Sequence, residues 1–215
     1  MVGNGLMFKV RYGPYHAFSL RMRYSELVQS DLAEMPWIDG DLVLAVANTV
    51  VLDFPGDPTS PSLDMLAQEE TLATWRRRVP DAAVAELPLG ALLELRSAIR
   101  AALDAIDRIC PVPDDARDQL NTWAAGAPIT FTLTATGRLS FVEVADDVIG
   151  RLARETLRSF DEKSGDRIVR RCPAPGCGMF FRPGRRDQSW CTVRCGTRAR
   201  AARHRQQGQR GKEGR

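Results

Sequence analysis

Hydrophobic residues recur at the three- and four-residue spacing of amphipathic helices through much of the chain. Residues 88–109 show this most clearly, and the apolar residues of one stripe there are Leu92, Leu95, Ile99, Leu103 and Ile106. The stripe predicts a long helix with one apolar face, and that face is either core or the seam of a dimer. Shorter helices are expected at residues 25–35, 68–78, 113–125 and 146–162.

Residues 42–52 are apolar almost without interruption and follow Asp39 and Asp41, either of which is a suitable helix cap. A segment that is apolar all round predicts a buried helix. Asn48 is the only amide inside it, and a buried amide without a partner costs about 1–3 kcal/mol. We therefore expect Asn48 to hydrogen-bond within the core, with a ligand contact as the alternative.

Strict alternation of apolar and polar residues marks two further segments. Residues 129–144 alternate on both sides of Thr136-Gly137, and residues 6–24 alternate on both sides of Gly13-Pro14. Each pattern predicts a β-hairpin. The second hairpin would have a basic face, interpreted as solvated surface with a nucleic-acid contact as the alternative. Residues 55–62 are dense in proline and predict a surface loop.

Four of the five cysteines form two close pairs near the C-terminus. Cys172 and Cys177 make a C-x4-C pair, and Cys191 and Cys195 make a C-x3-C pair thirteen residues later. Such pairs are typical of one tetrahedral, structural Zn²⁺, because each supplies two thiolates from one turn. Two disulfides would instead need an oxidising compartment, which nothing in the sequence indicates. Cys110 lies apart from the pairs and is predicted to be a small buried hydrophobic residue.

Charge is distributed unevenly along the chain. Residues 170–215 contain thirteen Lys/Arg and two acidic residues, whereas residues 1–169 contain seventeen basic and twenty-five acidic residues. An acidic body with a basic end is expected when one end binds a polyanion. The sequence has no run of about 20 apolar residues for a membrane span and no apolar signal-peptide core. These features predict a cytoplasmic, nucleoid-associated protein with no membrane partner.

A helix rich in alanine and arginine is predicted after Cys195. Its arginines have no acidic partners four residues away, so a merely solvated helix would repel itself. Arginine binds phosphates and the edges of guanine, which favours contact with double-stranded DNA over a solvated helix end. The candidate DNA contacts are Arg185, Arg186, Arg194, Arg198, Arg200, Arg203, His204 and Arg205.

An enzymatic activity is not expected. Four thiolates fill the coordination of a zinc ion and leave no open position for water. The two histidines, His16 and His204, have no recognisable nucleophile beside them, and no glycine-rich phosphate loop is present.

The cysteine-rich segment resembles the CGNR zinc-finger family of bacterial proteins, in which an ABATE domain precedes the finger. The resemblance rests on Cys172 to Cys177, Met179-Phe180-Phe181, Trp190-Cys191, Cys195-Gly196-Thr197-Arg198 and Arg203-His204-Arg205. Residues 42–50 are similar, more loosely, to the Leu-Asp-Phe-Val-Asn-Thr segment of that family. Thr197 replaces the asparagine of the family's name, and Ala45 replaces the aspartate of the upstream segment.

The predicted fold class is α+β and mostly α, a helical body with one or two β-hairpins followed by a small four-cysteine zinc finger with an arginine-rich helix. The expected divisions are an N-terminal extension at 1–37, an ABATE-like domain at 38–165, the finger at 166–207 and a disordered basic tail at 208–215.

The resemblance implies a zinc-dependent, DNA-binding transcriptional regulator whose body senses a signal or forms a homodimer. The alternatives are an RNA-binding zinc knuckle and a protein-interaction module with a basic tail.

Overall fold

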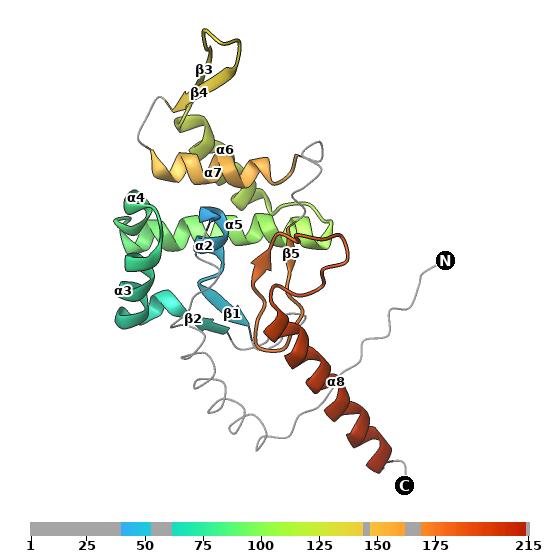
Figure 1. The fold of residues 1–215 in the computed structure, drawn as a ribbon. Helices are drawn as coiled ribbons and strands as arrows, with labels where there is room; N and C mark the ends of the chain where they lie inside the picture. Colours follow the sequence, from blue (N-terminus) through green and yellow to red (C-terminus); the bar gives the residue numbers. More distant parts are fainter. Residues whose placement is uncertain (1–39, 53–61, 144–146, 162–168, 214–215) are drawn as a thin grey trace. The chain divides into compact units, whose positions relative to one another are not determined.

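The computed structural model describes residues 40–52, 62–143, 147–161 and 169–213. Within these ranges the chain forms helices and three two-stranded antiparallel sheets (Figure 1), which confirms the mostly helical α+β class. The hairpin expected at 6–24, the helix expected at 25–35 and nearly all of the loop at 55–62 lie outside the described residues.

The core is built around the long helix α5 (Leu89–Arg108). Leu92, Leu95, Ile99 and Leu103 of its apolar stripe are fully buried. The stripe is therefore core, and it is not available as the seam of a dimer.

Two further helices pack beside α5 through small side chains. They are α6 (Asp114–Gly126) and α7 (Val148–Arg158), which share a buried cluster with α5 formed by Ala98, Ala102, Ala116, Leu120 and Ala153. Gly150 of α7 lies so near α6 that an added Cβ would come within 2.7 Å of the Trp123 carbonyl oxygen. Close packing of these helices therefore requires glycine at this position.

The prediction of one helix across residues 42–52 is wrong in its second half. The helix α2 (Leu42–Ala47) is capped by Asp41 and ends after six residues. Val50–Leu52 instead form strand β1, which pairs antiparallel with β2 (Ser62–Asp64). Valine favours extended backbone, and an unbroken apolar run cannot by itself distinguish a buried strand from a buried helix.

Three helical segments follow β2 along the chain, and one of them contacts α2. These are η1 (Met65–Ala67), α3 (Glu69–Arg78) and α4 (Ala82–Ala85). Trp75 of α3 is fully buried, and its indole N–H donates to the Ala45 carbonyl at 3.1 Å. An ion pair between Arg96 of α5 and Asp64 of β2, at 2.6 Å, fixes the short sheet against the core.

The hairpin expected at residues 129–144 is confirmed. Strands β3 (Ile129–Leu133) and β4 (Leu139–Glu143) pair antiparallel, and Gly137 occupies the turn with φ of 73°. Phe131 lies opposite Phe141 and Leu133 lies opposite Leu139, so these side chains share one face of the hairpin. All of them are more than half exposed.

The C-terminal segment contains β5 (Arg170–Arg171), β6 (Phe180–Phe181) and α8 (Val193–Glu213). Residues 208–213, for which the sequence predicts a disordered tail, continue α8 in the structure. Glutamine, arginine, lysine and glutamate favour helix strongly enough here to extend it through two glycines. Among the described residues, no helix has the length and apolar composition needed to cross a membrane.

Cys110 is exposed, so its predicted burial is wrong. Ile109 ends α5 in the left-handed conformation, with φ of 52°. Cys110 therefore lies on the turn beyond the helix, past the last position of the buried face.

Candidate metal centre

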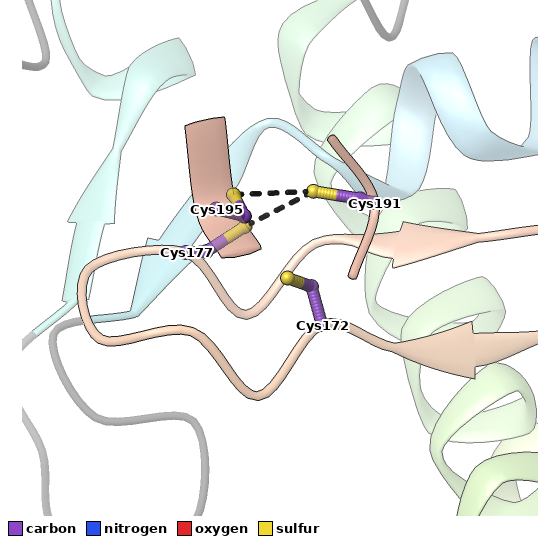
Figure 2. A group of neighbouring side chains, drawn as sticks. All are labelled: Cys172, Cys177, Cys191 and Cys195. Atoms are coloured by element: carbon purple, nitrogen blue, oxygen red, sulfur yellow. Dashed lines mark hydrogen bonds between the residues drawn. The ribbon is translucent and has the colours of Figure 1, made fainter. Parts of the chain in front are cut away.

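The four paired cysteines come together at one point. Their Sγ atoms all lie within 4.8 Å of one another, and none of them forms a disulfide (Figure 2). Zinc bound to four thiolates at about 2.3 Å in a tetrahedron places the sulfur atoms about 3.8 Å apart. The separations are 3.6 Å for Cys177–Cys191 and 3.4 Å for Cys191–Cys195. The cluster therefore fits one zinc ion.

Each cysteine pair is positioned by a local turn. Cys172 directly follows β5, and its N–H donates to the Met179 carbonyl at 2.8 Å, which closes the first knuckle. Gly176 and Gly178 on either side of Cys177 both have φ of 68°, a conformation that favours glycine.

The second pair spans the start of α8. Cys191 precedes the helix and Cys195 lies in its first turn. The Thr192 hydroxyl accepts a hydrogen bond from the Cys195 N–H at 3.2 Å, as an N-cap does. The C-x3-C spacing thus brings two thiols together at the beginning of a capped helix.

Because the four thiols lie close together, hydrogen bonds among them shift their pKa values in opposite directions. A hydrogen bond with Cys177 lowers the pKa of Cys172 to about 7, and a hydrogen bond with Cys172 lowers the pKa of Cys195 well below its usual range. Hydrogen bonds with Cys172 raise the pKa values of Cys177 and Cys191. All four thiols ionise together only when a cation compensates their charge, which is what a coordinated metal does.

Arg198 contributes to the metal site, a role that the sequence analysis missed. Its guanidinium donates a hydrogen bond to the Cys195 Sγ at 3.3 Å, and the residue is half-buried. Four thiolates around Zn²⁺ carry a net charge of about −2, so a neighbouring cation stabilises them. The spacing of three residues on one helix is the signal from which this contact could have been predicted.

Six of the other candidate DNA contacts are on the surface, in two groups. Arg194, Arg200, Arg203 and His204 are exposed on α8, while Arg185 and Arg186 are exposed in the turn between β6 and α8. Arg205 also lies on α8, but its side chain is outside the described residues.

The two sides of α8 have different surroundings. Cys195, Gly196 and Ala199 are buried against the knuckle, whereas Thr197 and Arg200 are exposed. The Arg200 guanidinium donates to the Thr197 hydroxyl at 3.1 Å, so these two side chains meet on the outer face. The helix therefore supports the metal site with one face and presents the other to solvent.

The aromatic residues of the finger serve as packing. Phe180 and Phe181 are 1% and 7% exposed, and Trp190 is half-buried. A Cβ on Gly196 would come within 3.0 Å of the Trp190 ring, which explains why glycine follows Cys195. These side chains therefore belong to the packing of the finger.

Asn48 is fully buried and hydrogen-bonds within the core, but its partner is the finger. Its amide nitrogen donates to the Phe180 carbonyl at 2.9 Å, and the Phe180 N–H donates to its amide oxygen at 2.7 Å. Both polar atoms of the amide are thereby satisfied by backbone 132 residues away, which confirms the expected hydrogen bond in place of the alternative ligand contact.

Two family models match the chain and confirm both parts of the resemblance. The ABATE model, described as "Putative stress-induced transcription regulator", matches residues 40–160, and the CGNR zinc finger model matches residues 168–207. A search of the curated proteins gives no match.

Proposed function

Because the chain belongs to the ABATE family and carries a CGNR zinc finger, we propose that it is a transcriptional regulator whose zinc-loaded finger binds double-stranded DNA. The exposed arginines of α8 support this proposal most directly. Arg194, Arg200 and Arg203 project from a helix whose start is held by the metal ligands. A helix fits the major groove, where arginine pairs with guanine and also reaches phosphates.

The burial of the finger's aromatics favours duplex DNA over single-stranded RNA. Recognition of single-stranded RNA usually stacks bases on exposed aromatic rings. Phe180 and Phe181 are buried, so they are not available for stacking. The role is also non-catalytic on this proposal, because four thiolates leave zinc no position for water.

A salt titration of the zinc-loaded chain on a random duplex pool tests the proposal. Affinity should fall steeply as salt rises, since each phosphate contact contributes about 0.9 to the slope of log K against log salt. Replacing Arg200 and Arg203 with alanine should lower both affinity and slope. Arg138→Ala, which removes an exposed arginine from the turn of the β3–β4 hairpin, is the matched control.

Two results would reject the proposal. One is the absence of measurable duplex binding at low salt with zinc loaded. The other is displacement of duplex DNA by single-stranded RNA at equal concentration, which would support the RNA-binding alternative. Capture of one acidic protein by the finger in the presence of nuclease would instead favour the protein-interaction module.

The exposed face of the β3–β4 hairpin supports homodimerisation as the second task of the body. Phe131 and Phe141 are 60% and 56% exposed, and Leu133 and Leu139 are 74% and 68% exposed. An aromatic side chain offers about 150–250 Å², so the four present on the order of 450 Å² of apolar surface. A second copy packed on this face through a two-fold axis would bury on the order of 1,000 Å², near the lower bound for a specific interface.

Sedimentation equilibrium tests the dimer. Replacing Leu133 and Leu139 with serine should convert a dimer into a monomer, while Thr132→Ser on the opposite face of the hairpin should leave the mass unchanged. A monomeric unaltered chain at all concentrations would show that a second copy does not cover this face.

A further inference from the structure

Three hydrogen bonds join residues 48–52 of the body to the backbone of Cys177 and Phe180. Two of them are the reciprocal pair between the Asn48 amide and Phe180. The third runs from the Leu52 N–H to the Cys177 carbonyl at 3.0 Å. All three come from residues 48–52, the end of α2 and strand β1, and they reach a metal ligand and the strand that follows it.

The Asn48 amide makes the hydrogen bonds to β6 that the backbone of a neighbouring strand would otherwise make. Phe180 lies opposite Arg171 of β5, and the Cys172 N–H bonds to the Met179 carbonyl on that same side. In an antiparallel pair, hydrogen-bonding groups alternate between the two edges. The N–H and C=O of Phe180 therefore point away from β5, and Asn48 offers the one donor and one acceptor that this free edge needs.

The Leu52 side chain of β1 packs directly against Gly178 of the first knuckle. A Cβ on Gly178 would lie 2.8 Å from the Leu52 Cβ, and Gly178 has φ of 68°. Glycine is therefore needed beside Cys177 both for the turn and for the contact with β1.

Charged side chains fix both ends of the same two strands. The Arg171 N–H donates to Asp107 at 2.9 Å, and the Arg171 guanidinium forms an ion pair with Asp104. Beyond β6, Arg182 forms an ion pair of 2.7 Å with Asp41, the residue that caps α2.

The Phe180 ring lies against two arginine side chains, one from the finger and one from the body. The guanidinium of Arg171 lies 4.6 Å from the centre of the Phe180 ring, and that of Arg100 from α5 lies 5.4 Å from it. Contacts of this kind are attractive when they are desolvated, and Phe180 is 1% exposed. The strands that carry the knuckle are thus held by the body at their ends, along the free edge of β6 and around the Phe180 ring.

We propose that the ABATE domain is part of the metal site: Asn48 and β1 complete the first knuckle, so that zinc affinity and the order of α2–β1 are coupled. Asn48 is a positioning residue that acts on Cys172 and Cys177 through the backbone of β6 and the knuckle. Coupling of this kind is reciprocal. Whatever loosens residues 48–52 lowers zinc affinity, and loss of zinc loosens residues 48–52.

Zinc competition with a chromophoric chelator tests the first half of this coupling in the full chain. Asn48→Ala should weaken zinc binding by about 10–100-fold, the effect expected when a group that orients metal ligands is removed. Asn121→Ala, which removes an exposed amide from α6, is the matched control and should leave affinity unchanged. Unaltered zinc affinity in a folded Asn48→Ala protein would overturn the proposal.

Hydrogen exchange tests the second half in the unaltered protein, so it decides the matter even if Asn48→Ala does not fold. Removing zinc with a chelator should speed amide exchange at residues 42–52, including the Leu52 N–H, while residues 114–126 of α6 keep their protection. Unchanged protection of residues 42–52 after zinc removal would show that the finger is an independent module. Neither test depends on whether the finger binds DNA.

Discussion

Two pairs of antiparallel strands in this protein lie at opposite extremes of burial. The strands of the β3–β4 hairpin pair over five residues each, yet Phe131 and Phe141 remain 60% and 56% exposed. The strands β5 and β6 pair over only two residues each, yet Phe180 and Phe181 are almost completely buried. The longer sheet depends mainly on its own cross-strand pairs, whereas the shorter one depends on its surroundings.

This difference shows why a strand pair as short as β5–β6 is stable. An isolated two-stranded hairpin is marginally stable in water even with strands of ordinary length. The knuckle of β5–β6 is closed by metal ligands, and its open edge is filled by Asn48. The β3–β4 hairpin does contact the helices, for instance where the Arg158 guanidinium lies 5.6 Å from the Phe141 ring centre, but its apolar face remains open.

Loss of a metal ligand should separate the two regions most strongly. Cys172→Ser should abolish stoichiometric zinc binding, whose free energy in small zinc modules is about 10–16 kcal/mol. Residues 169–213 should then lose protection from hydrogen exchange, while the cross-strand amides of 129–143 keep theirs. Elemental analysis for zinc and exchange mass spectrometry measure both effects. Cys110→Ser, at the exposed cysteine, should change neither.

Truncation of one ring in each sheet comes next in size. Phe180→Ala should lower the free energy of unfolding by about 3–5 kcal/mol, the usual cost of deleting a buried phenylalanine. Phe141→Ala should cost less than about 1 kcal/mol in the monomer, because the ring is 56% exposed. Urea unfolding at a dilution that excludes dimers measures both. Equal losses would mean that the hairpin face is covered within one chain.

The turn glycines of the two sheets provide a closer match. Gly178 has φ of 68° and Gly137 has φ of 73°, so alanine is strained to a similar degree at both. Only Gly178 has a neighbour, Leu52, within the reach of an added Cβ, and such a clash adds about 1–3 kcal/mol. Thermal unfolding should therefore show a larger loss for Gly178→Ala. Equal losses would indicate that backbone strain alone accounts for both.

Acid should weaken an ion pair of α7, the helix that follows the β3–β4 hairpin. The expected effect is smaller than those of the preceding substitutions. Asp81 caps α4 and forms an ion pair with Arg151 of α7 at 2.5 Å. Burial raises the pKa of Asp81, but the hydrogen bonds from Arg151 and the Val84 N–H, together with the charge of Arg151, outweigh it, and the pKa lies below its ordinary 3.8. A carboxylate with a lowered pKa in the folded state stabilises the fold above its unfolded pKa, and this contribution is lost as the pH falls through the folded value.

Asp81→Asn should therefore cost about 1 kcal/mol at pH 7 and little at pH 3. Asparagine keeps the capping oxygen, so the difference isolates the ion pair. Urea unfolding at the two pH values measures it. A loss of equal size at both would assign the effect to the cap.

Much of this structure could be predicted from the local spacing of residues in the sequence. The two cysteine pairs predicted the metal cluster, the apolar stripe predicted α5, and alternation around Gly137 predicted the β3–β4 hairpin. Each of these patterns is complete within a few turns or strands, so neighbouring residues suffice to specify it.

Contacts between distant segments were not predictable in this way. Nothing near Asn48 indicates that Phe180 is its partner, since the two lie 132 residues apart. The apolar run before Leu52 is compatible with helix or strand, and only pairing with β2 decides it. The contact of Arg198 with the Cys195 Sγ is local, three residues apart on one helix, but the charge of Arg198 directed the prediction to a nucleic-acid contact.

The two faces of α8 also have a consequence for how this protein can change over evolutionary time. Residues that pack on the knuckle, such as Gly196 and Ala199, are constrained by the fold. Thr197 faces outward and interacts with Arg200. It occupies the position of the asparagine in the Cys-Gly-Asn-Arg motif after which the family is named. A substitution there alters the shape of the outer surface and leaves the scaffold intact. Substitutions at position 197 can therefore change the exposed surface of α8 without first costing the protein its ability to fold.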